Sequence, residues 1–83
     1  MGIAERSLND LTGEAVALKG ADKADKLGDI RLALESKTSE EIEHDIKMIT
    51  DINRLYLLMA AGVHGHNYFV LTSRIQIIKE KVE

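Results

Sequence analysis

The feature that most constrains this chain is a long gap in its charge. Residues 55–73 contain no Asp, Glu, Lys or Arg, although these types make up 30% of the 83 residues. Within the gap, residues 55–61 are apolar on every side of a helix, and such a helix has to be enclosed on every side. Two or three helices could hardly surround one of their own number, so we expect another protein chain to cover part of this run. The alternative is an ordinary core helix with one or two exposed leucines.

The gap is also long enough to be considered as a membrane span. Residues 62–67, however, include two glycines, two histidines and an asparagine, and these would lie near the bilayer centre, where polar groups are costly. A membrane span is therefore disfavoured. The N-terminus lacks the apolar segment of a secretory signal, which leaves the cytoplasm as the default compartment.

Composition favours helices and argues against several functions. The chain has no proline and only three aromatic residues, and it is rich in residues that favour helices. Without cysteine it can form neither disulfides nor cysteine-ligated zinc sites. The net charge is −3 and the basic residues are dispersed, which disfavours nucleic acid as a partner. A small chain without such cross-links often gains stability by self-association, so we expect a homo-oligomer.

Hydrophobic spacing predicts helices in the first half of the chain. A helix is expected over about residues 3–19, where apolar residues recur at spacings of 4, 3, 4 and 3, and Gly13 weakens it. The spacing fails over residues 20–26, which are polar apart from alanine. We expect a loop or frayed turn there, with a continuous bent helix as the alternative. Helical spacing resumes over residues 27–35.

The second half predicts a capped helical unit over about residues 39–82. Thr38 can cap it, and Glu41 stands three residues later, as a capping box requires. Asn53 falls on the apolar stripe of this unit, where a buried asparagine can fix register and oligomer state, although it could equally lie at the edge. Gly62 and Gly65 predict a break or kink near residues 62–67, either in one kinked helix or between two helices.

The expected fold is all-α. We predict a single helical domain over residues 1–83, arranged as an antiparallel helical hairpin or a small three-helix bundle, in an oligomer. A strand over residues 68–78 is the minority alternative, because only part of that segment alternates.

His64 and His66 suggest a different chemistry. On an extended segment both would point the same way and could bind zinc with a third ligand. The sequence His-Gly-His-Asn-Tyr at residues 64–68 resembles the metal-binding strand motif of the 6-pyruvoyltetrahydropterin synthase family, in which the two histidines are zinc ligands. The resemblance covers five residues, and that family has a longer, sheet-based fold. His44, the other histidine, lies in a segment predicted to be helical, so we treat the match as chance.

The function that we expect is a non-catalytic protein-interaction or assembly module, without a cofactor. It would self-associate or dock in a larger complex through residues 55–71. The residues predicted to make this contact are apolar members of that segment: Leu55, Tyr56, Leu58, Met59, Val63, Tyr68, Phe69 and Leu71. The alternative is a small metal- or ligand-binding protein that uses His64 and His66.

Overall fold

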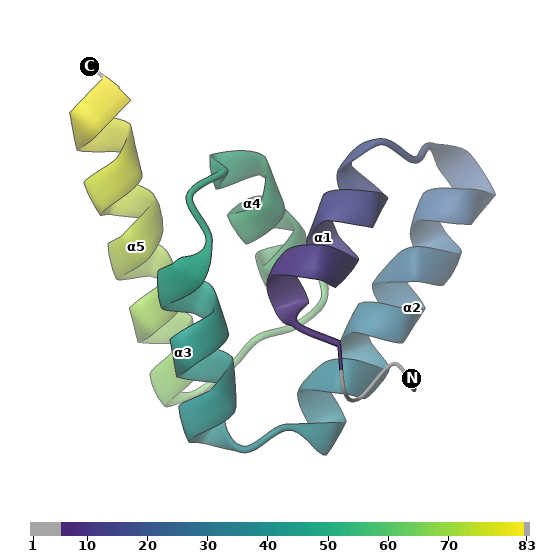
Figure 1. The fold of residues 1–83 in the computed structure, drawn as a ribbon, viewed down its shortest axis with the longest axis horizontal. Helices are drawn as coiled ribbons and strands as arrows, with labels where there is room; N and C mark the ends of the chain where they lie inside the picture. The colour runs from purple at the N-terminus through teal and green to yellow at the C-terminus, as the bar shows by residue number, and fades with distance from the viewer. Residues whose placement is uncertain (1–5, 83) are drawn as a thin grey trace.

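Five α-helices make up the computed structural model, which describes residues 6–82. In chain order they are α1 (Leu8–Val16), α2 (Gly20–Ser36), α3 (Ser39–Met48), α4 (Ile52–Ala60) and α5 (His66–Val82) (Figure 1). No strand occurs within these residues. The all-α prediction is confirmed.

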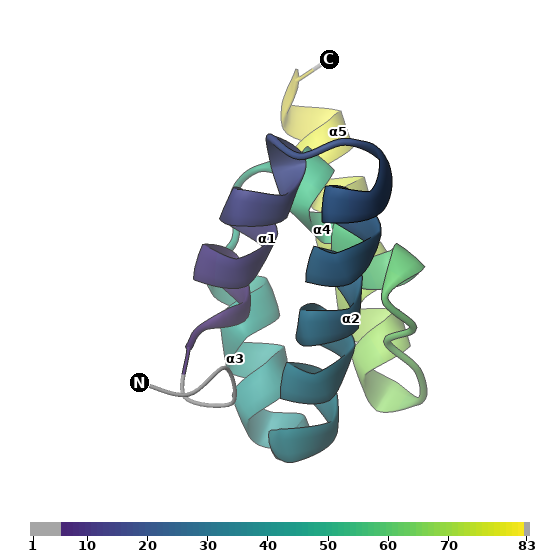
Figure 2. The same cartoon turned by 90° about the vertical axis from the view of Figure 1, so that its right-hand side faces the viewer.

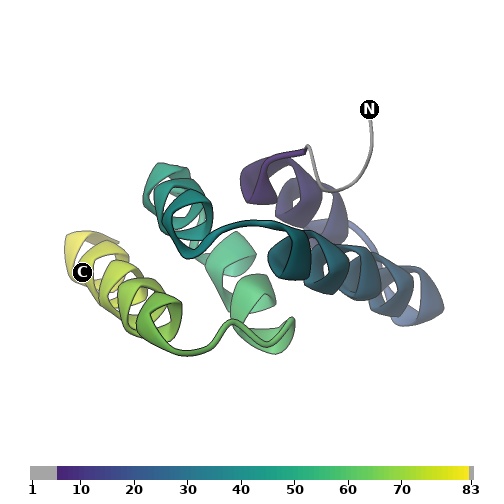
Figure 3. The same ribbon diagram turned by 90° about the horizontal axis from the view of Figure 1, so that it is seen from below.

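Helix α4 lies at the centre of the arrangement. It contacts α1, α2 and α5, and the end-on view shows it between the α3–α5 pair and the α1–α2 pair (Figure 3). Helices α1 and α2 lie side by side in opposite directions (Figure 2). Helices α3 and α5 run in the same direction (Figure 1). The predicted hairpin or three-helix bundle is therefore wrong, because the chain divides into shorter helices that surround α4.

The break between α3 and α4 is one that the sequence pattern did not predict. Ile49 is extended, with ψ 129°, and is fully buried. Asp51 then caps α4, and its Oδ1 accepts a hydrogen bond of 2.9 Å from the Asn53 backbone N–H. The apolar residues of α3 and α4 both face the core, so their helical spacing continues across residues 42–63. This spacing therefore gave no sign of the turn between the two helices.

The predicted break near residues 62–67 is a turn between two helices. Gly62 has φ +96°, which a residue with a Cβ rarely adopts. Its N–H donates to the Met59 carbonyl at 3.2 Å, and the Val63 N–H donates to the Leu58 carbonyl at 3.4 Å. This pair of bonds is a Schellman motif, which satisfies the last carbonyls of α4. Gly65, with φ +64°, completes the turn before α5.

The first two helices differ from their predicted bounds. The polar loop expected over residues 20–26 is wrong, because α2 is helical from Gly20 onward. Only Ile30 and Ala33 of α2 are fully buried, so its first turns face water and carry no apolar stripe. Helix α1 is shorter than the expected 3–19: Ser7 caps it by accepting a bond from the Asp10 N–H. Residues 3–5 of that prediction lie outside the described residues.

The core is built around the uncharged run. Leu55 and Leu58 of α4 are fully buried, Leu57 and Ala61 are nearly so, and they join one apolar cluster with residues from all five helices. The premise that another chain has to enclose residues 55–61 does not hold, because five short helices provide neighbours that two or three long ones would lack. Tyr56 remains exposed on the outer side of α4.

Candidate functional site

The residues predicted for an interaction surface separate into a buried and an exposed group. The buried group belongs to the protein's own core and consists of Leu55, Leu58, Val63 and Leu71, with Met59 half-buried against them. The exposed group consists of Tyr56, Tyr68 and Phe69. Only the exposed group is accessible to a partner.

An exposed apolar surface lies along α5. Phe69 is 71% exposed and Ile77 is 44% exposed. They flank a groove of about 560 Å³ whose other lining residues are Lys47, His66, Val70, Ser73 and Arg74. We define the outer face of α5 as five exposed residues of this helix: His66, Phe69, Ser73, Ile77 and Glu80.

Helix α5 lies at an edge of the molecule, so it has an inner side that packs on its neighbours and an outer face (Figure 1). Its inner side, with Asn67, Leu71 and Ile75 buried, packs on α3 and α4. The outer face repeats at spacings of 3, 4, 4 and 3, which is also a helical stripe. The sequence analysis named Leu71 of the inner side and Phe69 of the outer face, but it did not connect Phe69 with Ile77. The same spacing rule, started at His66, would have found the outer one.

The two ends of the outer face differ in charge. At its start, His66 Nε2 lies 2.7 Å from Glu43 Oε1 of α3. Hydrogen bonds from Lys47, which also approaches at 2.8 Å, and then from His66 hold the pKa of Glu43 below its ordinary value. At its far end, the Glu80 carboxylate accepts a hydrogen bond from Gln76 of the same helix. An imidazole thus begins the face and a carboxylate ends it.

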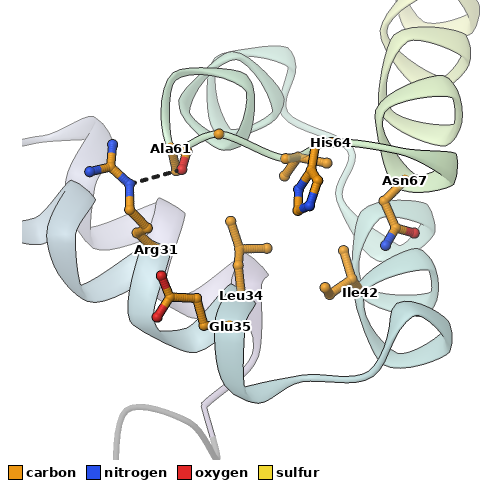
Figure 4. Close-up of a pocket in the computed structure, with 9 residues that line it drawn as sticks. Arg31, Leu34, Glu35, Ile42, Ala61, His64 and Asn67 are labelled. Carbon is orange, nitrogen blue, oxygen red and sulfur yellow. Dashed lines mark hydrogen bonds between the residues drawn. The ribbon is translucent and has the colours of Figure 1, made fainter.

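A separate pocket of about 250 Å³ lies between α2, α3 and the turn from α4 to α5 (Figure 4). His64 extends from the turn into the space between Leu34 and Ile42, and Arg31 and Glu35 lie at its α2 side. Asn67, in the first turn of α5, completes the opposite side. This pocket is independent of the groove on α5.

The structure separates the two histidines that the sequence brought together. His64 lines the pocket, whereas His66 is the first residue of α5 and pairs with Glu43. The segment is a turn and a helix start, so the extended strand on which the metal motif depends is not formed. Residues 6–82 hold no cluster of three His, Cys, Asp or Glu side chains that could bind a metal ion.

Asn53 and the break-forming glycines take local roles. Asn53 is exposed at the start of α4, so within this chain it is not the buried seam residue considered above. Gly62 and Gly65 shape the turn that positions His64 and Asn67.

Comparisons of the chain with models of protein families, with curated proteins and with solved structures give no match. None of the helices among residues 6–82 has the length and apolarity needed to cross a bilayer.

Proposed function

We propose that this protein is a non-catalytic helical module that self-associates, with two copies pairing through the outer face of α5. The observation that carries the proposal is the symmetry of this face about Ser73. Its residues are spaced 3, 4, 4 and 3, a pattern that reads the same in both directions. A two-fold interface requires a surface that complements itself, and this one does when the two helices run antiparallel.

The pairing places chemically matched residues opposite each other. With Ser73 on the two-fold axis, Phe69 faces Ile77 of the second copy, and Ile77 faces Phe69 of the second copy. His66 then faces Glu80 of the second copy, so an imidazole N–H can donate a hydrogen bond to the carboxylate. The small Ser73 side chain allows the two helices to approach closely at the centre, while the apolar pairs on either side exclude water.

The strength of this contact is limited by its size. Each copy contributes two large exposed apolar side chains, Phe69 and Ile77, together with the half-buried Val70. Burying them has to offset the loss of translational and rotational freedom on association. We therefore expect a weak dimer whose population depends on protein concentration.

The test is the mass of the full chain in solution, measured by sedimentation equilibrium over a wide concentration range. We expect the mass to rise from monomer to dimer. Phe69→Glu should remain monomeric throughout, because it places two like charges in the apolar contact. Tyr56→Glu is the matched control: it changes an exposed aromatic residue of α4 that lies beside Val16 and Lys23, away from the outer face, and should dimerise like the unaltered chain.

Two results would contradict the proposal. One is a chain that stays monomeric at every concentration. The other is a Phe69→Glu variant that is helical by circular dichroism and still associates normally. Substitution at Leu58 would not test the proposal, because this residue is fully buried and a charge there would unfold the chain.

A further inference from the structure

Arg74 is a half-buried cation that lines the groove of α5. Its Nε donates to the Ile49 carbonyl at 3.2 Å, which holds the side chain against the end of α3. Among residues 6–82 no carboxylate pairs with it, and its two Nη atoms have no hydrogen-bond partner. The buried polar atoms that lack a partner do not include either Nη, so both remain accessible from outside. Two adjacent Nη donors suit the two oxygens of a carboxylate.

The other basic side chains of the groove already share one carboxylate. Lys47 Nζ lies 2.8 Å from Glu43, and His66 Nε2 lies 2.7 Å from the same residue. Glu43 itself does not line the groove, and none of the described residues that do is acidic. The charge left without a partner in the groove is therefore positive, and it belongs to Arg74. An anion complements it.

The rest of the groove is apolar and elongated. Phe69 and Ile77 are 71% and 44% exposed, and the half-buried Val70 lies between them along α5. Phe69 and Ile77 are about two helical turns apart, a distance of about 12 Å along the helix axis. The groove has a volume of about 560 Å³. An extended alkyl chain can cover these residues and remove them from water, whereas a compact inorganic anion would leave them exposed.

We propose that this groove binds a medium-chain fatty acid as its anion. The carboxylate accepts hydrogen bonds from the Arg74 Nη atoms, and the alkyl chain lies on Phe69, Val70 and Ile77. The groove is complete in one chain, so this binding does not rest on the proposed self-association. A bound alkyl chain would cover Phe69 and Ile77, which pairing of two copies would bury. Under the proposed function, fatty acid and second copy therefore compete for this face.

The test compares octanoate with 1-octanol, which has a chain of the same length but no charge. Each is titrated into dilute full chain at neutral pH and followed by amide chemical shifts in two-dimensional NMR. We expect saturable shifts at residues 66–77 and around Lys47 and Ile49. Octanol should bind about tenfold more weakly, because a hydroxyl does not form the charge-assisted bonds of a carboxylate. Absent saturation, equal binding of the two compounds, or shifts centred on residues 61–64 would overturn the proposal. A chain that stays monomeric at every concentration would contradict self-association only, and the titration would still decide on binding.

A variant ties the preference to Arg74. Arg74→Gln removes the charge and keeps an amide N–H that can donate to the Ile49 carbonyl. The preference for octanoate over octanol should disappear in this variant. It should persist in Lys79→Gln, which removes the same charge from an exposed residue of α5 outside the groove. A folded Arg74→Gln variant that keeps the preference would contradict the assignment. If it does not fold, the comparison of the two compounds in the unaltered chain still decides.

Discussion

At the scale of single residues, Gly13 shows how a contact between distant segments gives a residue its role. Sequence analysis took this glycine as a weak point of a helix. In the structure the Arg54 guanidinium of α4 lies against it, and a Cβ at position 13 would be 3.0 Å from Arg54 Cζ. Arg54 Nη1 donates to Asn9 Oδ1 at 2.7 Å and so joins α4 to α1. The missing side chain makes room for this link, which no local pattern could predict.

Glu14 should make stability depend on acid pH. Hydrogen bonds from Arg6 and then from Lys26, the latter at 2.8 Å, lower the pKa of Glu14 to about 2 from an ordinary value of 4.5. Because the folded-state pKa is depressed, the contribution of Glu14 is complete above about pH 4.5 and is lost as the pH falls toward 2. Glu14→Gln should therefore be less stable than the unaltered chain at neutral pH, and the difference should shrink in acid.

Urea unfolding at neutral pH and at about pH 3 measures this difference. The control is Asp25→Asn, which removes an exposed carboxylate of α2 that has no ion pair among the described residues and should show no comparable change with pH. A Glu14→Gln deficit that is the same at both pH values would mean that the ion pairs with Arg6 and Lys26 do not form in solution.

At the scale of the helices, the sequence predicted ends that are set by local chemistry. The capping box is confirmed: Thr38 Oγ1 accepts from the Glu41 N–H at 3.1 Å, and Glu41 Oε1 accepts from the Thr38 N–H at 3.2 Å. Asp51 is an equally recognisable cap residue, but the apolar stripe continues across it, so no helix start was predicted there. The start of α2 was missed because its residues show no apolar stripe. Hydrophobic spacing reports burial, and a helix whose first turns face water shows none.

Two glycine substitutions should change stability in opposite directions. Gly28 is helical, and a Cβ there would meet nothing within 4 Å, so Gly28→Ala should raise the free energy of unfolding by about 0.5–1 kcal/mol. Gly62 also has open space, but its φ of +96° is strained for alanine, so Gly62→Ala should lower that free energy by about 1–2 kcal/mol. Chemical denaturation measures both. Stabilisation by both substitutions would show that Gly62 does not need its left-handed conformation.

At the scale of the whole molecule, the sequence predicted the fold class but not the arrangement. The uncharged run correctly indicated deep burial, since Leu55 and Leu58 are fully buried. An apolar stripe, however, does not say which neighbour covers it. The identity of that neighbour depends on the number of helices, and the predicted number was too low because the turn at residues 49–51 was missed. For the same reason, core residues such as Leu71 were predicted to lie on a partner surface, and Ile77 was not included.

The final prediction concerns how self-association would alter the dynamics of the molecule. The second half of α5 extends past the end of α3 (Figure 1), and its exposed side has no neighbour within the described chain. Amide hydrogens there should exchange rapidly with solvent in dilute solution, because local opening of a helix packed on one side costs little. Pairing of two outer faces would cover residues 66–80, so protection of these amides should rise with protein concentration.

Hydrogen exchange at low and high protein concentration separates this effect from general stabilisation. Amides in the water-facing first half of α2, on the opposite edge of the molecule, serve as the internal control and should exchange at the same rate in both samples. Phe69→Glu should remove the concentration dependence in α5 and leave the α2 amides unchanged. Uniformly raised protection in both helices would indicate that association takes place elsewhere, whereas protection that changes only in α5 locates the contact on its outer face.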